Sequence, residues 1–65
     1  MEITFNYEVR KNGKKTSLFI RKMEDTIWVS TICIPSFHRD YQFAMEKINA
    51  SNNIQDTLVY LDSVL

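Results

Sequence analysis

Residues 1–22 read MEITFNYEVRKNGKKTSLFIRK, and their pattern predicts the first two strands of the fold. In residues 1–10, apolar side chains at odd positions alternate with polar side chains at even positions. This pattern is typical of a half-buried β-strand. Asn12 and Gly13 follow, and this dipeptide accepts the two positive φ angles of a type I′ turn. The sequence therefore predicts a β-hairpin whose second strand covers residues 15–22.

A two-residue loop at Asn12-Gly13 also predicts the register, with Phe5 opposite Ile20 and Asn6 opposite Phe19. The core face then collects the apolar side chains of both strands: Ile3, Phe5, Tyr7, Val9, Leu18 and Ile20. Phe19 is expected on the opposite face, beside Ser17 and Arg21.

Residues 26–34 (TIWVSTICI) predict a third strand, after a short turn at residues 23–25. Both of its faces carry large apolar groups, so two registers stay open. An even-length turn directs one set toward the core, namely Val29, Thr31 and Cys33. An odd-length turn instead directs the other set toward the core, namely Trp28, Ile32 and Ile34. In either register, one face of this strand exposes an apolar row unless something covers it.

Two helices are predicted after Pro35, which cannot donate to a strand ladder. Ser36 is expected to cap the first helix, over residues 37–50. Its apolar stripe would face the sheet through Phe37, Tyr41, Ala44, Met45 and Ile48, with Phe43 off the stripe. A break rich in capping residues at 51–53 precedes a second helix, over residues 54–64, with Ile54, Leu58, Leu61 and Leu65 on one face.

The predicted fold class is therefore α+β: a three-stranded antiparallel β-meander followed by two α-helices packed on one face. We expect residues 1–65 to form a single small domain, with a meander over 1–34 and a helical half over 36–65. A chain of 65 residues has little room for both a core and a substrate pocket, so no enzyme is expected.

The single Cys and single His exclude a disulfide framework, and they predict neither a metal site nor a cofactor. Cys33 is interpreted as a small buried hydrophobe, His38 as a surface or subunit-contact residue, and Asp40 as a partner of the helix dipole. No membrane span or signal peptide is recognisable, which favours a cytoplasmic protein that does not bind membranes.

Charge is balanced overall, with eight Lys and Arg against eight Asp and Glu, but it is unevenly distributed. Residues 10–22 hold six of the eight basic side chains and no acid. One hypothesis is nucleic-acid binding, with Phe19 stacking on bases while basic groups neutralise phosphates. Its site would comprise Arg10, Lys11, Lys14, Lys15, Phe19 and Arg21. The alternative is a solvated hairpin whose lysines discourage edge pairing.

Surplus apolar surface supports the leading hypothesis, a small non-enzymatic interaction protein. It would bind and modulate or inhibit a larger protein by occlusion, and a homodimer is plausible. The expected contact residues are Phe19, Arg21, Trp28, Phe43 and Tyr60. The second helix could instead fold back over Phe43, and a free third-strand edge would allow strand addition. Chains of this size are typical of inhibitors and antitoxins encoded by phages and mobile elements.

Residues 7–15 (YEVRKNGKK) are similar to the first hairpin in the N-terminal DNA-binding domains of some phage and transposon integrases. Those domains place a three-stranded sheet before a helix, so the resemblance implies DNA binding. The same order resembles a fold of dimeric single-stranded-DNA-binding proteins, which has an additional strand. The two resemblances assign no role to a particular residue.

Overall fold

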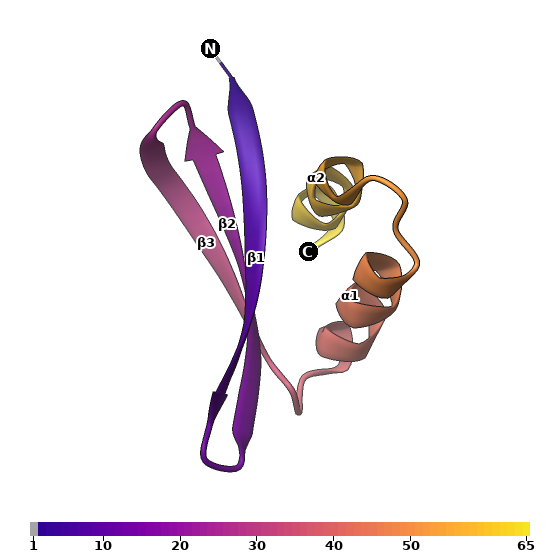
Figure 1. The fold of residues 1–65 in the computed structure, drawn as a ribbon. Helices are drawn as coiled ribbons and strands as arrows, with labels where there is room; N and C mark the ends of the chain where they lie inside the picture. The colour runs from indigo at the N-terminus through magenta and orange to yellow at the C-terminus, as the bar shows by residue number, and fades with distance from the viewer. Residues whose placement is uncertain (1) are drawn as a thin grey trace.

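The computed structural model describes residues 2–65 and consists of one sheet with two helices on one side of it (Figure 1). The strands are antiparallel and lie in the order β1-β2-β3. In chain order the elements are β1 (Ile3–Asn12), β2 (Lys15–Glu24), β3 (Ile27–Pro35), α1 (Arg39–Asn49) and α2 (Ile54–Val64). This arrangement confirms the predicted α+β meander with helices on one face.

The core lies between the sheet and the helices, where both layers present their apolar stripes. It consists of the buried side chains of Phe5, Leu18, Ile20, Ile34, Ala44, Ile48, Leu58 and Leu61. Ile3, Tyr7 and Val9 were predicted in the core but stay 52%, 42% and 39% exposed, so the helices cover only part of the sheet. Neither helix in residues 2–65 is long and apolar enough to cross a membrane.

The hairpin differs from its predicted register. The turn residues are Gly13 and Lys14, and β1 pairs with β2 through Asn12 opposite Lys15. Among the non-glycine residues described, only Asp25 has a positive φ, so Lys14 does not adopt the second positive angle of a type I′ turn. The one-residue shift of the loop moves the pairing by two residues. Each side chain therefore keeps its predicted face, but Phe19 lies opposite Glu8 instead of Asn6.

β3 follows neither predicted register along its whole length. Ile32 and Ile34 face the core, as in one register, and Trp28 faces away from it, as in the other. Ile32 and Ile34 pair with Ile20 and Leu18 on the core face. An irregularity between Lys22 and Met23 then shifts the ladder, so that Met23 pairs with Trp28. A bulge places one extra residue in a strand and redirects the side chains beyond it. For this reason Trp28 lies on the same face as Thr31, to which its indole donates a hydrogen bond.

The first helix begins two residues later than predicted. Ser36 is not its cap, because the Ser36 N–H donates to the Thr16 carbonyl at 2.8 Å and extends the sheet. His38 is the N-cap, and its Nδ1 accepts a hydrogen bond from the Asp40 N–H at 3.1 Å. Phe37 consequently precedes the helix and is 88% exposed, so it does not belong to the core stripe. The second helix has its predicted bounds and is capped by Asn53.

The Gln55 side chain links α2 to the edge of β1 that pairs with no other strand. The Phe5 N–H donates to Gln55 Oε1 at 2.9 Å, and Gln55 Nε2 donates to the Phe5 carbonyl at 2.7 Å. These two bonds satisfy the backbone groups of Phe5 as a neighbouring strand would. The side chain therefore fixes the position of α2 and closes part of this sheet edge.

Replacing Gln55 with Ala should lower the free energy of unfolding by about 1–2 kcal/mol, because two partly buried backbone groups lose their partners. Urea unfolding followed by circular dichroism measures this change. Gln55→Glu is the matched control, since it keeps an acceptor for the Phe5 N–H and loses only the donor. An alanine variant as stable as the parent would show that the bridge does not hold α2.

Candidate interaction surface

The side of the sheet that faces away from both helices is here called the outer face (Figure 1). One row of paired residues crosses its middle: Glu8 on β1, Phe19 on β2 and Cys33 on β3. Asn6, Arg21 and Thr31 form the next row toward the β2–β3 turn. Three strands thus bring an aromatic ring, a thiol and charged groups together on one surface.

Glu8 forms ion pairs with two arginines on this face. Its Oε2 accepts a hydrogen bond from Arg10 Nε at 3.0 Å and another from Arg21 Nη2. The Arg10 guanidinium carbon also lies 5.1 Å from the centre of the Phe19 ring, within cation–π range. Phe19 is therefore half-buried, and one carboxylate partly neutralises two of the predicted basic contacts. Sequence reasoning missed Glu8 because the predicted register placed Asn6 opposite Phe19.

Trp28 is the most exposed aromatic side chain of the outer face, at 64%. Its indole N–H donates to Thr31 Oγ1 at 2.6 Å and to the Ser30 carbonyl at 3.2 Å. These bonds hold the ring in one orientation although most of its surface is open to solvent. Ile27 and Val29, on either side of it, are 68% and 49% exposed. The three residues Ile27, Trp28 and Val29 are here called the apolar corner.

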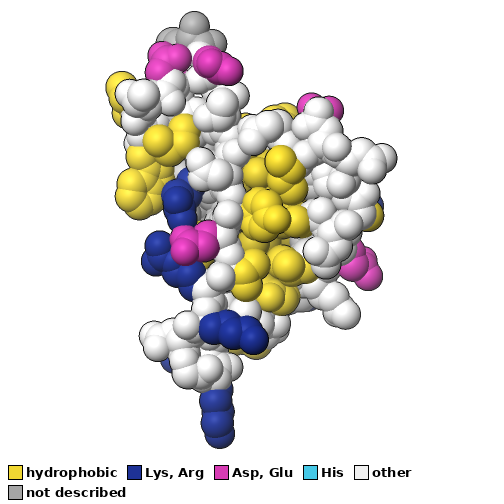
Figure 2. All heavy atoms as spheres, in the orientation of Figure 1, with side chains coloured by type: hydrophobic (Ala, Val, Ile, Leu, Met, Phe, Trp, Pro, Cys, Tyr) yellow, Lys and Arg dark blue, Asp and Glu magenta, His cyan; other side chains and the backbone are white. Residues whose placement is uncertain are grey.

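Charge is separated along the length of the sheet. Lys11, Lys14 and Lys15 are exposed at the tip of the β1–β2 hairpin, which extends beyond the helices (Figure 1). Glu2 and Asp25 meet at the opposite end, where the Glu2 N–H donates to Asp25 Oδ1 at 3.1 Å. Figure 2 shows this separation, with carboxylates at the top and basic side chains toward the bottom. The sheet therefore has a basic end and an acidic end.

Phe43 and Tyr60, the other two predicted contact residues, lie on the helices. Their ring centres are 6.4 Å apart, and Lys47 Nζ lies 5.5 Å from the Phe43 ring centre. Phe43 is half-buried and packs against the core, so α2 covers it as the alternative interpretation of the sequence proposed. Phe19, Arg21 and Trp28 therefore share one surface, and Phe43 and Tyr60 lie on the other side of the sheet.

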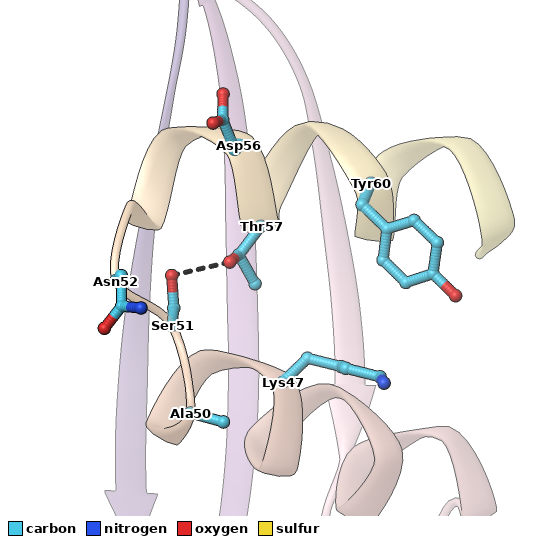
Figure 3. Close-up of a pocket in the computed structure, with 7 residues that line it drawn as sticks. All are labelled: Lys47, Ala50, Ser51, Asn52, Asp56, Thr57 and Tyr60. Carbon is cyan, nitrogen blue, oxygen red and sulfur yellow. Dashed lines mark hydrogen bonds between the residues drawn. The ribbon is translucent and has the colours of Figure 1, made fainter.

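A pocket of about 410 Å³ lies where α1 ends and α2 begins (Figure 3). Lys47 and Tyr60 line one part of it, and the hydroxyls of Ser51 and Thr57 face each other in another part. The Thr57 hydroxyl donates a hydrogen bond to the Ser51 hydroxyl across 2.6 Å, which joins the start of α2 to the loop before it. The lining offers one amine and the carboxylate of Asp56, without a paired acid and base for catalysis.

A smaller pocket of about 130 Å³ brings Cys33, His38 and Asp40 together at the β3 side of α1. Cys33 is exposed, so its interpretation as a buried hydrophobe was wrong. His38 Nδ1 accepts the capping bond and lies 3.5 Å from Asp40 Oδ2, which ties the imidazole to the helix start. Among residues 2–65, no group of three or more Cys, His, Asp or Glu side chains could hold a metal ion.

Comparison of the chain with protein-family models, with curated proteins and with solved structures found no significant match.

Proposed function

We propose that this protein is a small, non-enzymatic interaction protein that binds a larger protein and modulates it by occlusion. The contact surface is the outer face together with the apolar corner. One observation carries the proposal: Trp28 is 64% exposed and yet held in place by two hydrogen bonds. A fixed aromatic anchor loses little side-chain freedom on binding, so more of its buried area contributes to affinity.

The composition of the surface supports the same function. Tryptophan and arginine are enriched among residues that dominate binding energy at protein interfaces. Here Trp28 and Arg21 lie on adjacent strands, and Phe19 lies next to Arg21 along the outer face. Within the part of the chain that the structure describes, both helices pack on the opposite side (Figure 1). A cytoplasmic setting belongs to the proposal, because an exposed thiol such as Cys33 stays reduced there.

Site-specific photo-crosslinking in the source cells tests this proposal. A benzophenone side chain replaces Trp28 in one variant and Tyr60, which is 47% exposed on the helical side, in a matched control. We expect position 28 to give a defined covalent adduct with a protein larger than this chain, and position 60 to give none. Adducts that form only at position 60 would place the interaction surface on the helices.

Nucleic-acid binding is the second candidate, favoured by a pocket of about 270 Å³ that Arg10, Lys15 and Phe19 line together. Such a complex should weaken steeply with rising salt, because phosphate contacts release counterions. Replacing both Lys14 and Lys15 with Glu should abolish it. Fluorescence anisotropy with a mixed-sequence oligonucleotide at low and high salt measures this. We expect no salt-dependent binding of the oligonucleotide, because Arg10 and Arg21 are already paired with Glu8.

A further inference from the structure

The two edges of the sheet differ sharply in how they are protected. At the β1 edge, Gln55 occupies the backbone groups of Phe5, and the strand carries Glu8, Arg10 and Lys11. β3 reads IWVSTICIP and contains no charged residue in nine positions. Natural proteins usually protect an exposed edge with charges, prolines or a covering element. In β3, only the bulge near Trp28 and the terminal Pro35 protect the edge.

The backbone of β3 has free hydrogen-bonding groups on this edge. The Ser36 N–H donates to the Thr16 carbonyl. This bond shows which residues of β3 direct their backbone groups toward β2. In an antiparallel ladder, residues bonded to the neighbouring strand alternate with residues whose N–H and C=O point away. The backbone of Ile32 therefore points toward β2, while Thr31 and Cys33 direct their backbone groups outward.

The geometry points to a second copy of this chain as the occupant of the edge. We propose that β3 pairs antiparallel with β3 of another copy, with Thr31 facing Thr31 at a two-fold axis. Thr31 is the midpoint of Ile27–Pro35, so this register spans the strand, with Cys33 of each copy opposite Val29 at the bulge of the other. The two sheets then form one continuous sheet of six strands, with both outer faces on the same side.

The exposed apolar groups complement each other in this arrangement. Phe37 and Ile27 are the two most exposed large hydrophobic residues in the described chain, at 88% and 68%. They lie at opposite ends of β3. Antiparallel pairing sets Ile27 of each copy opposite Pro35 of the other, two residues from Phe37, at both ends of the interface. Parallel pairing would instead place each residue beside its own counterpart.

The charges complement each other in the same way. Glu24 and Asp25 lie at the β2–β3 turn, whereas Lys15 and Arg39 lie at the opposite end of β3. Antiparallel pairing sets the acidic turn of each copy at the level of the basic end of the other. Complementary potentials of this kind fix orientation and register at an interface, and a parallel pair would align like charges.

Sedimentation velocity over a range of protein concentrations tests the pairing. The parent protein is expected to dimerise. Thr31→Pro removes an outward N–H that no bond within the chain uses, so the monomer should fold while its dissociation constant rises at least about tenfold. Thr31→Val is the matched control, because it also loses the hydroxyl that accepts from Trp28 but keeps the N–H. It should dimerise as the parent does.

Oppositely charged substitutions at position 31 test the pairing even if the proline variant misfolds. Thr31→Lys and Thr31→Glu should each be monomeric, since like charges would meet at the axis. An equimolar mixture should recover dimers, because position 31 of one copy faces position 31 of the other. A parent that stays monomeric at every concentration, or a mixture that stays monomeric, would overturn the pairing.

The pairing does not depend on the proposed function. The dimer uses the edge of β3 and shares Ile27 with the apolar corner, whereas the occluding contact uses the outer face with Trp28. Dimers that give no crosslink to another protein would contradict only the proposed function. A monomer that crosslinks through position 28 would contradict only the pairing.

Discussion

Leu18→Ala should cost about 3 kcal/mol of unfolding free energy and lower the melting temperature by about 15 °C. Leu18 is fully buried at the centre of β2, where it pairs with Val9 on one side and Ile34 on the other. A chain of this size has a total stability on the order of 3–10 kcal/mol. Its single cysteine allows no disulfide within the chain, so the variant should lose a large share of its total stability.

Thermal unfolding monitored by circular dichroism measures this effect, and Val9→Ala is its control. Val9 faces Leu18 across the hairpin but is 39% exposed, so its truncation should cost less than about 1 kcal/mol. Similar losses from both variants would show that the helices do not cover Leu18 more closely than Val9.

Ile32→Pro should lower the unfolding free energy by about 3 kcal/mol, whereas Thr31→Pro should cost less than about 1 kcal/mol. The two residues are neighbours, but the ladder directs their backbone groups to opposite sides. Proline at position 32 removes a bond to β2 and leaves the Ile20 carbonyl without its donor. Proline at position 31 removes an N–H that points away from the sheet.

Urea unfolding of the two proline variants at a concentration below dimer formation provides the comparison. Ile32→Ala is the control for the lost side chain, because Ile32 is half-buried against the core. The proline variant should be clearly less stable than this control. Equal destabilisation by proline at positions 31 and 32 would contradict the assignment of β3 as an open edge.

Periodicity alone predicted the fold class because each element has one clear apolar stripe. The alternating residues of β1 and the Leu58–Leu61 stripe of α2 have one apolar face each, and Phe5, Leu58 and Leu61 occupy the core as predicted, whereas Ile3, Tyr7 and Val9 stay partly exposed. The hairpin faces also survived the error in register, because a two-residue shift preserves the alternation of side chains. Where a period is clear, local pattern and tertiary packing lead to the same structure.

The candidate surface was harder to predict because it depends on irregular features. A bulge turns Trp28 to the outer face, and both faces of β3 are apolar, so no alternation signals it. The Glu8 contacts with Arg10 and Arg21 depend on where the hairpin turns, which Asn12-Gly13 suggested one residue too early. The sequence proposed Phe19, Arg21 and Trp28 together with Phe43 and Tyr60, and could not show that the last two lie on the helices, apart from the outer face.

Amide hydrogen exchange of β3, measured residue by residue at low and high protein concentration, tests most directly whether this protein meets another chain through its open edge. At low concentration we expect slow exchange at Ile32 and Ile34 and fast exchange at Thr31 and Cys33. At high concentration the Thr31 and Cys33 amides should become protected. Fast exchange at these two amides at every concentration would contradict the pairing, and slow exchange in the dilute monomer would contradict the open edge itself.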